Sequence, residues 1–232
     1  EHCAMPPGKF SIRDWMENGT GVLFITWRED MKDSMKPLIS SFVDVFCSAL
    51  LSMPEDQRRR WWLVIDELGS MEKMASLEDF LTKGRKNGGR ALVGLQSVSQ
   101  TDEIFGQKLS QTLRASFRSL VVLGGSKTDP ETAEEMSKAL GEHEVARPEY
   151  TDSRNPGSSR STSERMVRST ERVVTAAQIQ ALPDLMGWVA FAGDRPIAKF
   201  KLEPINFAVR NAPFIQATRY GARGAAHLSA NG

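Results

Sequence analysis

The fold of this chain is decided by one stretch of sequence, Trp61-Trp62-Leu63-Val64-Ile65-Asp66-Glu67. It joins five bulky apolar residues directly to two carboxylates. A compact apolar run of this length is typical of a buried strand. Strands without a polar face occur mainly in parallel sheets with helices packed on both sides. The abrupt change to acidic residues marks the carboxyl end of the strand, which is where open parallel sheets bind their ligands.

Similar apolar runs alternate with helical stretches over most of the chain. Pro37 lies near the start of the first helical stretch, where a helix tolerates proline. The alternation predicts an α/β fold with a mainly parallel sheet flanked by helices. We predict strands at 21–27, 61–65, 91–95 and 120–123, and helices at 35–50, 68–86, from about 97 to 116, and 129–140.

The end of the chain has a different character. Residues 151–170 are rich in Ser and Arg, and we expect a flexible loop because such a sequence buries too little apolar surface to offset its ordering entropy. A short helix at 176–181 follows. Two strands at 188–192 and 197–202 flank the turn sequence Gly193-Asp194-Arg195-Pro196, which predicts a β-hairpin.

Composition excludes several classes of protein. The chain has 232 residues, and 30 Lys and Arg nearly balance 29 Asp and Glu, so the net charge of +1 excludes a dedicated basic nucleic-acid coat. Cys3 and Cys47 are too few for a disulfide framework or a four-thiolate metal site. Asp44 interrupts the longest apolar run, so the sequence predicts no membrane span.

Polar residues that follow two predicted strands are the candidate catalytic groups. Asp66 and Glu67 end one strand, and Gln96 follows the next. The first carboxylate suits Mg²⁺ held through water, and the second suits orientation or deprotonation of an attacking water. Gln96 would contact that water and the γ-phosphate. The alternative is a strand end that meets solvent, with Asp66 helping to start the next helix.

Arg85 is a further candidate, at the end of the predicted helix 68–86. It is either a cation that complements the helix dipole, like Lys83 and Lys86, or an arginine finger that reaches the nucleotide of a neighbouring subunit. The residues alone leave both roles open. No Gly-x-x-x-x-Gly-Lys-Ser/Thr loop occurs anywhere, so these 232 residues supply half of a nucleotide site at most.

Several motifs together resemble the TraD/TrwB family of conjugative coupling proteins, over roughly residues 8–215. The likeness is carried by residues 62–70, 77–86, 94–100, 112–120, 140–144, 182–185 and 193–199. The resemblance implies a RecA-like P-loop NTPase core of the FtsK/HerA type. It also implies a DNA-translocating ATPase that delivers relaxase-bound single-stranded DNA to a type IV secretion channel during bacterial conjugation.

The same resemblance assigns roles and partners. Asp66 would be the Walker B carboxylate for Mg²⁺, Glu67 the catalytic glutamate, Gln96 the γ-phosphate sensor, and Arg85 a finger acting in trans. ATP and Mg²⁺ would be the cofactors. Single-stranded DNA, relaxase and relaxosome proteins, channel components and five further copies in a homo-hexamer would be the partners, at the cytoplasmic face of the inner membrane.

The resemblance also implies an arrangement of parts. Residues 8–150 would be the C-terminal part of the nucleotide-binding domain, 151–170 the flexible loop, 171–215 the completing helix and hairpin, and 216–232 a disordered tail. The Walker A loop and the membrane anchor would lie upstream, so this fragment is expected to be inactive alone. Two alternatives stay open. One is a non-hydrolysing adaptor that binds relaxosome or secretion proteins, and the other is a chromosome-partitioning motor of the FtsK type.

Overall fold

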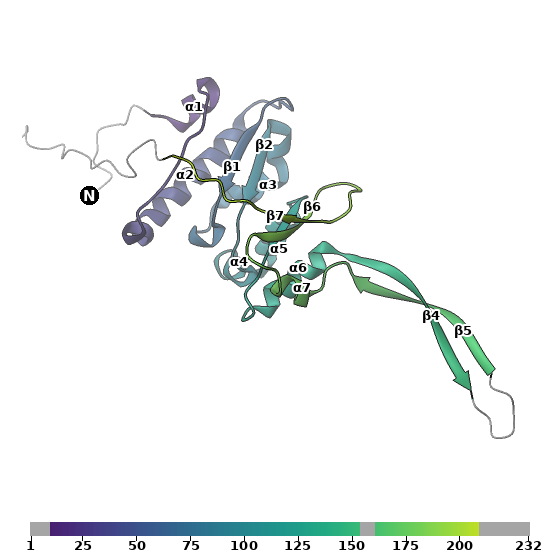
Figure 1. Cartoon of the computed structure of the whole chain (residues 1–232). Coiled ribbons are helices and arrows are strands. Elements are labelled where there is room, and N and C mark those ends of the chain that lie inside the picture. Colours follow the sequence, from purple (N-terminus) through teal and green to yellow (C-terminus); the bar gives the residue numbers. More distant parts are fainter. Residues whose placement is uncertain (1–9, 154–160, 209–232) are drawn as a thin grey trace, which may run out of the picture. The chain divides into compact units, whose positions relative to one another are not determined.

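The computed structural model describes residues 10–153 and 161–208. The chain divides into two units, Glu1–Lys201 and Leu202–Gly232, and every helix and strand below belongs to the first (Figure 1). The helices are α1 (Ile12–Asn18), α2 (Lys32–Ser52), α3 (Ala75–Lys83), α4 (Val98–Phe105), α5 (Gln107–Ala115), α6 (Pro130–Leu140) and α7 (Ala176–Gln180). Short 3-10 turns are η2 (Glu29–Met31), η3 (Leu68–Ser70) and η4 (Gly84–Asn87). The strands are β1 (Trp61–Ile65), β2 (Gly89–Val93), β3 (Leu120–Leu123), β4 (Glu142–Ser153), β5 (Ser161–Arg172), β6 (Met186–Ala190) and β7 (Ala198–Lys201).

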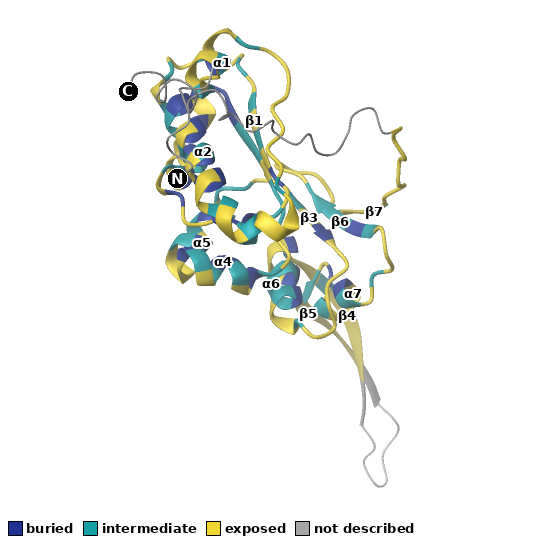
Figure 2. Cartoon of the chain, turned by 90° about the vertical axis from the view of Figure 1, so that its left-hand side faces the viewer, coloured by how far each residue is buried: buried dark blue, intermediate teal, exposed yellow. Residues whose placement is uncertain are grey.

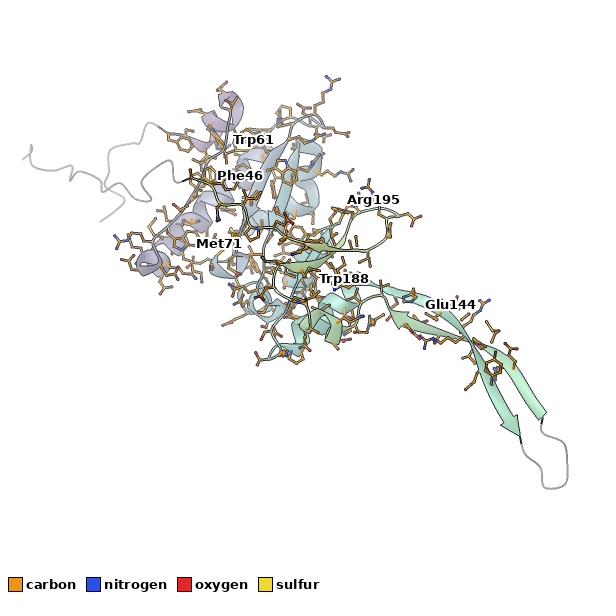
Figure 3. The ribbon with its side chains drawn as sticks, viewed as in Figure 1. Phe46, Trp61, Met71, Glu144, Trp188 and Arg195 are labelled. Carbon is orange, nitrogen blue, oxygen red and sulfur yellow. The ribbon has the colours of Figure 1, made fainter. Side chains whose placement is uncertain are left out.

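The first sheet is a parallel pair, with β1 and β2 in register from Trp61↔Gly89 to Ile65↔Val93. The apolar sides of α2 and α3 pack against one face of this pair. The rings of Phe46 on α2 and Trp61 on β1 meet edge to face at 6.4 Å (Figure 3). Figure 2 shows the buried residues along α2. This cluster positions the carboxyl ends of β1 and β2.

The other face of this pair is uncovered among the described residues. Trp62 and Val64 of β1 are 59% and 63% exposed, and Leu92 of β2 is 58% exposed. The sequence predicts strands covered on both faces. In the structure the helices cover one face, and no described helix or strand packs against the second face.

The strand predicted at 21–27 is wrong. These residues have no regular secondary structure, and Val22 and Phe24 lie exposed. A strand needs a neighbouring strand for its backbone hydrogen bonds. Within the described residues, β1 pairs with β2 alone, so residues 21–27 form no backbone ladder with it.

The single helix predicted at 68–86 is also wrong, because three elements occupy this stretch. The turn η3 comes first, α3 starts only at Ala75, and η4 follows it. Met71, Met74 and Leu77 of this stretch are buried in the core. Pro37 differs slightly from its predicted place, because α2 begins at Lys32 and the proline therefore lies in the second helical turn.

A second sheet of three strands has the order β3-β6-β7, and both pairings are antiparallel. The helices α6 and α7 contribute to a small core under it, which consists of Val122, Ala133, Leu140, Val174 and Ile179. The predicted C-terminal β-hairpin is confirmed as β6–β7. The expectation of a mainly parallel sheet needs correction, because β3 pairs antiparallel with β6 and only β1–β2 is parallel among the described strands.

The structure contains strands where the sequence predicts a loop at 151–170. Strand β4 includes residues 151–153, and β5 includes 161–170, in one antiparallel hairpin with Glu142 opposite Arg172 and Ser153 opposite Ser161. Residues 154–160 lie outside the described residues. Cross-strand ion pairs, such as Arg172–Glu142 and Arg147–Glu171, each at 3.0 Å, replace the apolar contacts on which the prediction relied. The predicted tail at 216–232 also lies outside the described residues.

The stretch Glu29–Ser52 has 24 residues and is long and apolar enough to cross a membrane, with a mean hydropathy of 1.3 over its most apolar 18 residues. The sequence predicts no such span, because Asp44 interrupts it. In the structure Cys47 and Leu50 are fully buried, and Asp44 Oδ1 accepts a 2.7 Å hydrogen bond from the backbone N–H of Ser76. The helix therefore packs as a core helix. Burial in this core raises the pKa of the Cys47 thiol to about 12.

Candidate active site

The backbones that follow β1 and β2 remain hydrogen-bonded beyond the ends of the strands. The Gly94 N–H donates to Ile65 O at 2.8 Å, and the Leu68 N–H donates to Gly94 O at 3.0 Å. A side chain at position 94 would place its Cβ 2.0 Å from Asp66 O. Glycine at this position therefore allows the Asp66-Glu67 segment to lie directly against the segment that leads to Gln96.

The two carboxylates at the end of β1 have different surroundings. Asp66 is exposed, whereas Glu67 is half-buried. Glu67 Oε1 accepts a hydrogen bond from the Gly69 N–H at 3.0 Å, as the N-cap of η3. The capping role that the sequence offers as an alternative for Asp66 thus belongs to Glu67. A single hydrogen bond leaves much of the capacity of this carboxylate available to a water or ligand.

A depression of about 240 Å³ lies at this edge of the sheet. The structure brings the predicted residues Glu67 and Gln96 together in its wall. Asp66 is not among the lining residues. Gly69, Ser70 and Gln100 also line the depression, and so do two lysines of α2. The full lining is Lys32, Lys36, Glu67, Gly69, Ser70, Gln96 and Gln100.

The helix α4 that follows Gln96 is held by polar contacts. Ser97 caps it by accepting a hydrogen bond from the Gln100 N–H at 3.3 Å. Asp102 accepts a 2.9 Å hydrogen bond from Arg114 of α5. A hydrogen bond from Ser110, together with Arg114, lowers the pKa of Asp102. These contacts fix the position from which Gln96 and Gln100 reach the depression.

Arg85 lies at the opposite end of the sheet. It is exposed in η4, whose C-cap Gly88 has a left-handed φ of 93°, and β2 begins at the residue after Gly88. Burial lowers the pKa of Arg90, and the nearby charges of Arg60 and Arg85 lower it further. Arg85 precedes β2 and Glu67 follows β1, so the length of a five-residue strand, roughly 15 Å, separates the two residues. The structure does not bring Arg85 to the carboxylates of its own chain.

No group of three or more His, Cys, Asp or Glu side chains with a metal-binding arrangement occurs in the part of the chain that the structure describes. The site therefore does not fit a metal held by protein ligands alone. Asp66 fits Mg²⁺ of the kind that keeps most of its waters and takes one carboxylate together with phosphate oxygens.

Sequence reasoning missed the two lysines, Gln100, and the backbone at Gly69 and Ser70. Lys32 and Lys36 are four residues apart on one helix and so share a side of α2, whereas Gln96 precedes the N-cap of α4 and Gln100 lies within α4. This spacing is the only signal in the sequence. Which face meets the carboxylates depends on how α2 and α4 pack.

Comparison with known proteins assigns the family. The family described as type IV secretion-system coupling protein DNA-binding domain matches residues 2–203. The chain belongs to this family. The coupling protein TraD of Escherichia coli (strain K12) is 34% identical over 217 residues, which represent 88% of this chain and 28% of that protein.

Solved structures of conjugative coupling proteins resemble the chain closely. The bacterial conjugative coupling protein TrwBdeltaN70, in its unbound monoclinic form, is 56% identical with a TM-score of 0.83. TrwB in complex with ADP and Mg²⁺ is 56% identical with a TM-score of 0.81. In both cases the match covers 93% of this chain and 48% of the other. The chain thus spans less than half the length of these relatives. The likeness confirms the α/β RecA-like fold and the predicted family.

The close approach at Gly94 yields a testable prediction. Gly94→Ala would drive a methyl group into Asp66 O and separate the two segments of the site. We expect the free energy of unfolding to fall by about 1–3 kcal/mol, measured by urea titration with tryptophan fluorescence, since Trp61 and Trp62 lie in β1. Gly125→Ala is the control, because its new Cβ would meet nothing closer than Ile179 Cγ2 at 3.8 Å. Equal stability of the two variants would contradict the role of Gly94.

Proposed function

We propose that this chain is part of an ATP-driven DNA-translocating coupling protein, and that the carboxyl edge of β1 and β2 is half of its ATP site. The observation that carries the proposal is the shared depression of Glu67 and Gln96, which two separate strands deliver to one place. The TrwB structures with ADP and Mg²⁺ and with an ATP analogue support a nucleotide as the ligand.

The proposed roles follow from position and chemistry. Asp66 would hold Mg²⁺ through its water shell, and this ion would supply charge neutralisation at the phosphates. Glu67 accepts a proton from the attacking water or orients it, since its carboxylate has one fixed hydrogen bond and lines the depression. Gln96 faces the same space with an amide that can donate to a phosphate oxygen.

The unpaired sheet edges support the proposal that part of the ATP site comes from a further strand of the longer protein. Among the described strands, β2 pairs only with β1, and β3 only with β6, so each has an edge without a strand. An open edge is a ready template for a further strand. We propose that a strand ending in the Walker A loop pairs there in the longer protein, and that this 232-residue piece is inactive alone.

The position of Arg85 supports assembly of several copies of the protein into a ring. Since Arg85 lies at the far end of the sheet from Glu67, it would serve a neighbouring copy, and head-to-tail contacts that close form rings. We propose a homo-hexamer at the cytoplasmic face of the inner membrane. Its partners would be single-stranded DNA, relaxase and channel components.

The test is ATP hydrolysis by full-length protein with and without single-stranded DNA. We expect turnover that DNA stimulates, and loss of turnover in Asp66→Ala. Substitution of Asp79, an acidic residue of α3 in an exposed ion pair with Lys83, by Ala is the control. Nucleotide binding without any turnover would favour the adaptor alternative and contradict the proposal.

A further inference from the structure

Two lysines of α2, Lys32 and Lys36, line the same depression as Glu67. Both lie in the first two turns of a helix of 21 residues. The helix dipole disfavours a cation in the first turn, where Lys32 lies, and like charges four residues apart repel each other. Two like charges thus lie together in the lining of the depression, and a bound anion would offset their repulsion.

The two lysines differ in their partners. Lys32 Nζ lies 3.8 Å from Glu29 Oε1, a weak ion pair within one turn. Lys36 is half-buried, and no hydrogen bond or ion pair of its ammonium occurs among the residues that the structure describes. Lysine is rarely removed from solvent without a counter-ion. The ammonium of Lys36 is therefore available to an anionic ligand.

Gln100 supplies a second unsatisfied group in the same wall. Its Oε1 is buried and has no hydrogen-bond partner. A Cβ built on Gly69 would lie 2.7 Å from Gln100 Oε1 and 2.9 Å from Glu67 Oε1, so the amide lies close to the carboxylate. Rotation of the amide by 180° exchanges O for NH₂ at nearly the same place. The position can thus present either an acceptor or a donor.

We propose that Lys36, assisted by Lys32 and Gln100, binds a phosphate group in this depression. The inference rests on the proposed function for the source of that phosphate, which is either the nucleotide or the DNA backbone. Three donors of NH₃⁺ and the NH₂ of a carboxamide are suited to phosphate oxygens. The depression would place the phosphate beside Glu67 and Gln96.

The test is binding by full-length protein, with a fluorescent ATP analogue and a fluorescein-labelled oligodeoxythymidylate as separate probes. We expect Lys36→Ala to weaken one probe about tenfold, which is typical for loss of one hydrogen bond to a charged group, and Lys36→Arg to retain most of the affinity. Lys138→Ala on α6 is the control, because this lysine already pairs with Glu134 and Glu135. Gln100→Glu should weaken the same probe more than Gln100→Ala, because it adds a negative charge.

The affected probe identifies the source of the phosphate. If DNA is affected, the slope of log affinity against log salt should also fall by about one. Unchanged binding of both probes by Lys36→Ala would overturn the inference, and so would a lower kcat with unchanged binding, because Lys36 would then act on Glu67. If the wild-type protein binds the probes but does not hydrolyse ATP, the proposed function fails, and the binding series still decides the phosphate site.

Discussion

Glu67→Gln should reduce ATP hydrolysis by full-length protein at least about 100-fold, the range for loss of a general base, while nucleotide binding is unchanged. Glutamine has nearly the same shape as glutamate, and its carbonyl oxygen can still accept the hydrogen bond from the Gly69 N–H. The turn η3 should therefore be retained. Only the ability to accept a proton from water is lost. Steady-state turnover and the affinity for a fluorescent ATP analogue measure the two quantities.

Glu72→Gln is the matched control for this variant. Glu72 lies exposed five residues further along the same loop, and its backbone N–H, not its carboxylate, bonds to Ser40 Oγ at 2.9 Å. The control should hydrolyse ATP like the wild type. Normal turnover in Glu67→Gln would leave Glu67 with the capping role alone and would remove the catalytic one.

Arg85→Ala should reduce hydrolysis about 1,000-fold, the lower range for an arginine finger, without loss of nucleotide binding. The guanidinium is exposed and at the far end of the sheet from Glu67, so its removal leaves the carboxylate wall of its own chain intact. Turnover and binding assays on the full-length protein measure this split.

Lys83→Ala is the control for Arg85, since Lys83 is the basic residue in the last turn of α3 and would complement the helix dipole equally well. Its ion pair with Asp79, at 2.7 Å, is exposed and contributes little stability. A role at the helix end predicts similar, small effects of both variants. That outcome would contradict the finger.

Local signals account for the parts of the fold that could be predicted. The strands β1 and β3 are continuous apolar runs. Asp129 caps α6 by accepting a 3.1 Å hydrogen bond from the Thr132 N–H, as the sequence Asp129-Pro130 predicts. The hairpin β6–β7 follows from its turn sequence. In each case the residues that decide the structure are neighbours in the sequence.

Elements that depend on distant partners could not be predicted. The apolar run at 21–27 satisfies every local criterion for a strand, yet a strand forms only beside another. The opposite holds for β4 and β5, which contain few apolar residues but pair along twelve positions. Pattern analysis searches for apolar periodicity and therefore misses a ribbon stabilised by ion pairs and backbone hydrogen bonds.

The candidate site was predictable only in part for the same reason. Glu67 and Gln96 directly follow strands, so parallel pairing places them at one edge. Lys36 and Gln100 enter the depression because of the way α2 and α4 pack on that edge. The sequence predicts that Arg85 lies at the end of a helix. The distance between Arg85 and Glu67 depends on the position of η4 before β2, which only the structure gives.

A mixture of two inactive variants tests most directly whether the ATP site is shared between copies. Arg85→Ala and Glu67→Gln proteins are combined in equal amounts, allowed to assemble, and assayed for hydrolysis. At interfaces where an intact Glu67 meets an intact Arg85 of the next copy, the site is complete, so activity should recover to at most about a quarter of wild type for random head-to-tail assembly. If mixed assemblies form and hydrolyse no faster than the two variants alone, the shared site is contradicted.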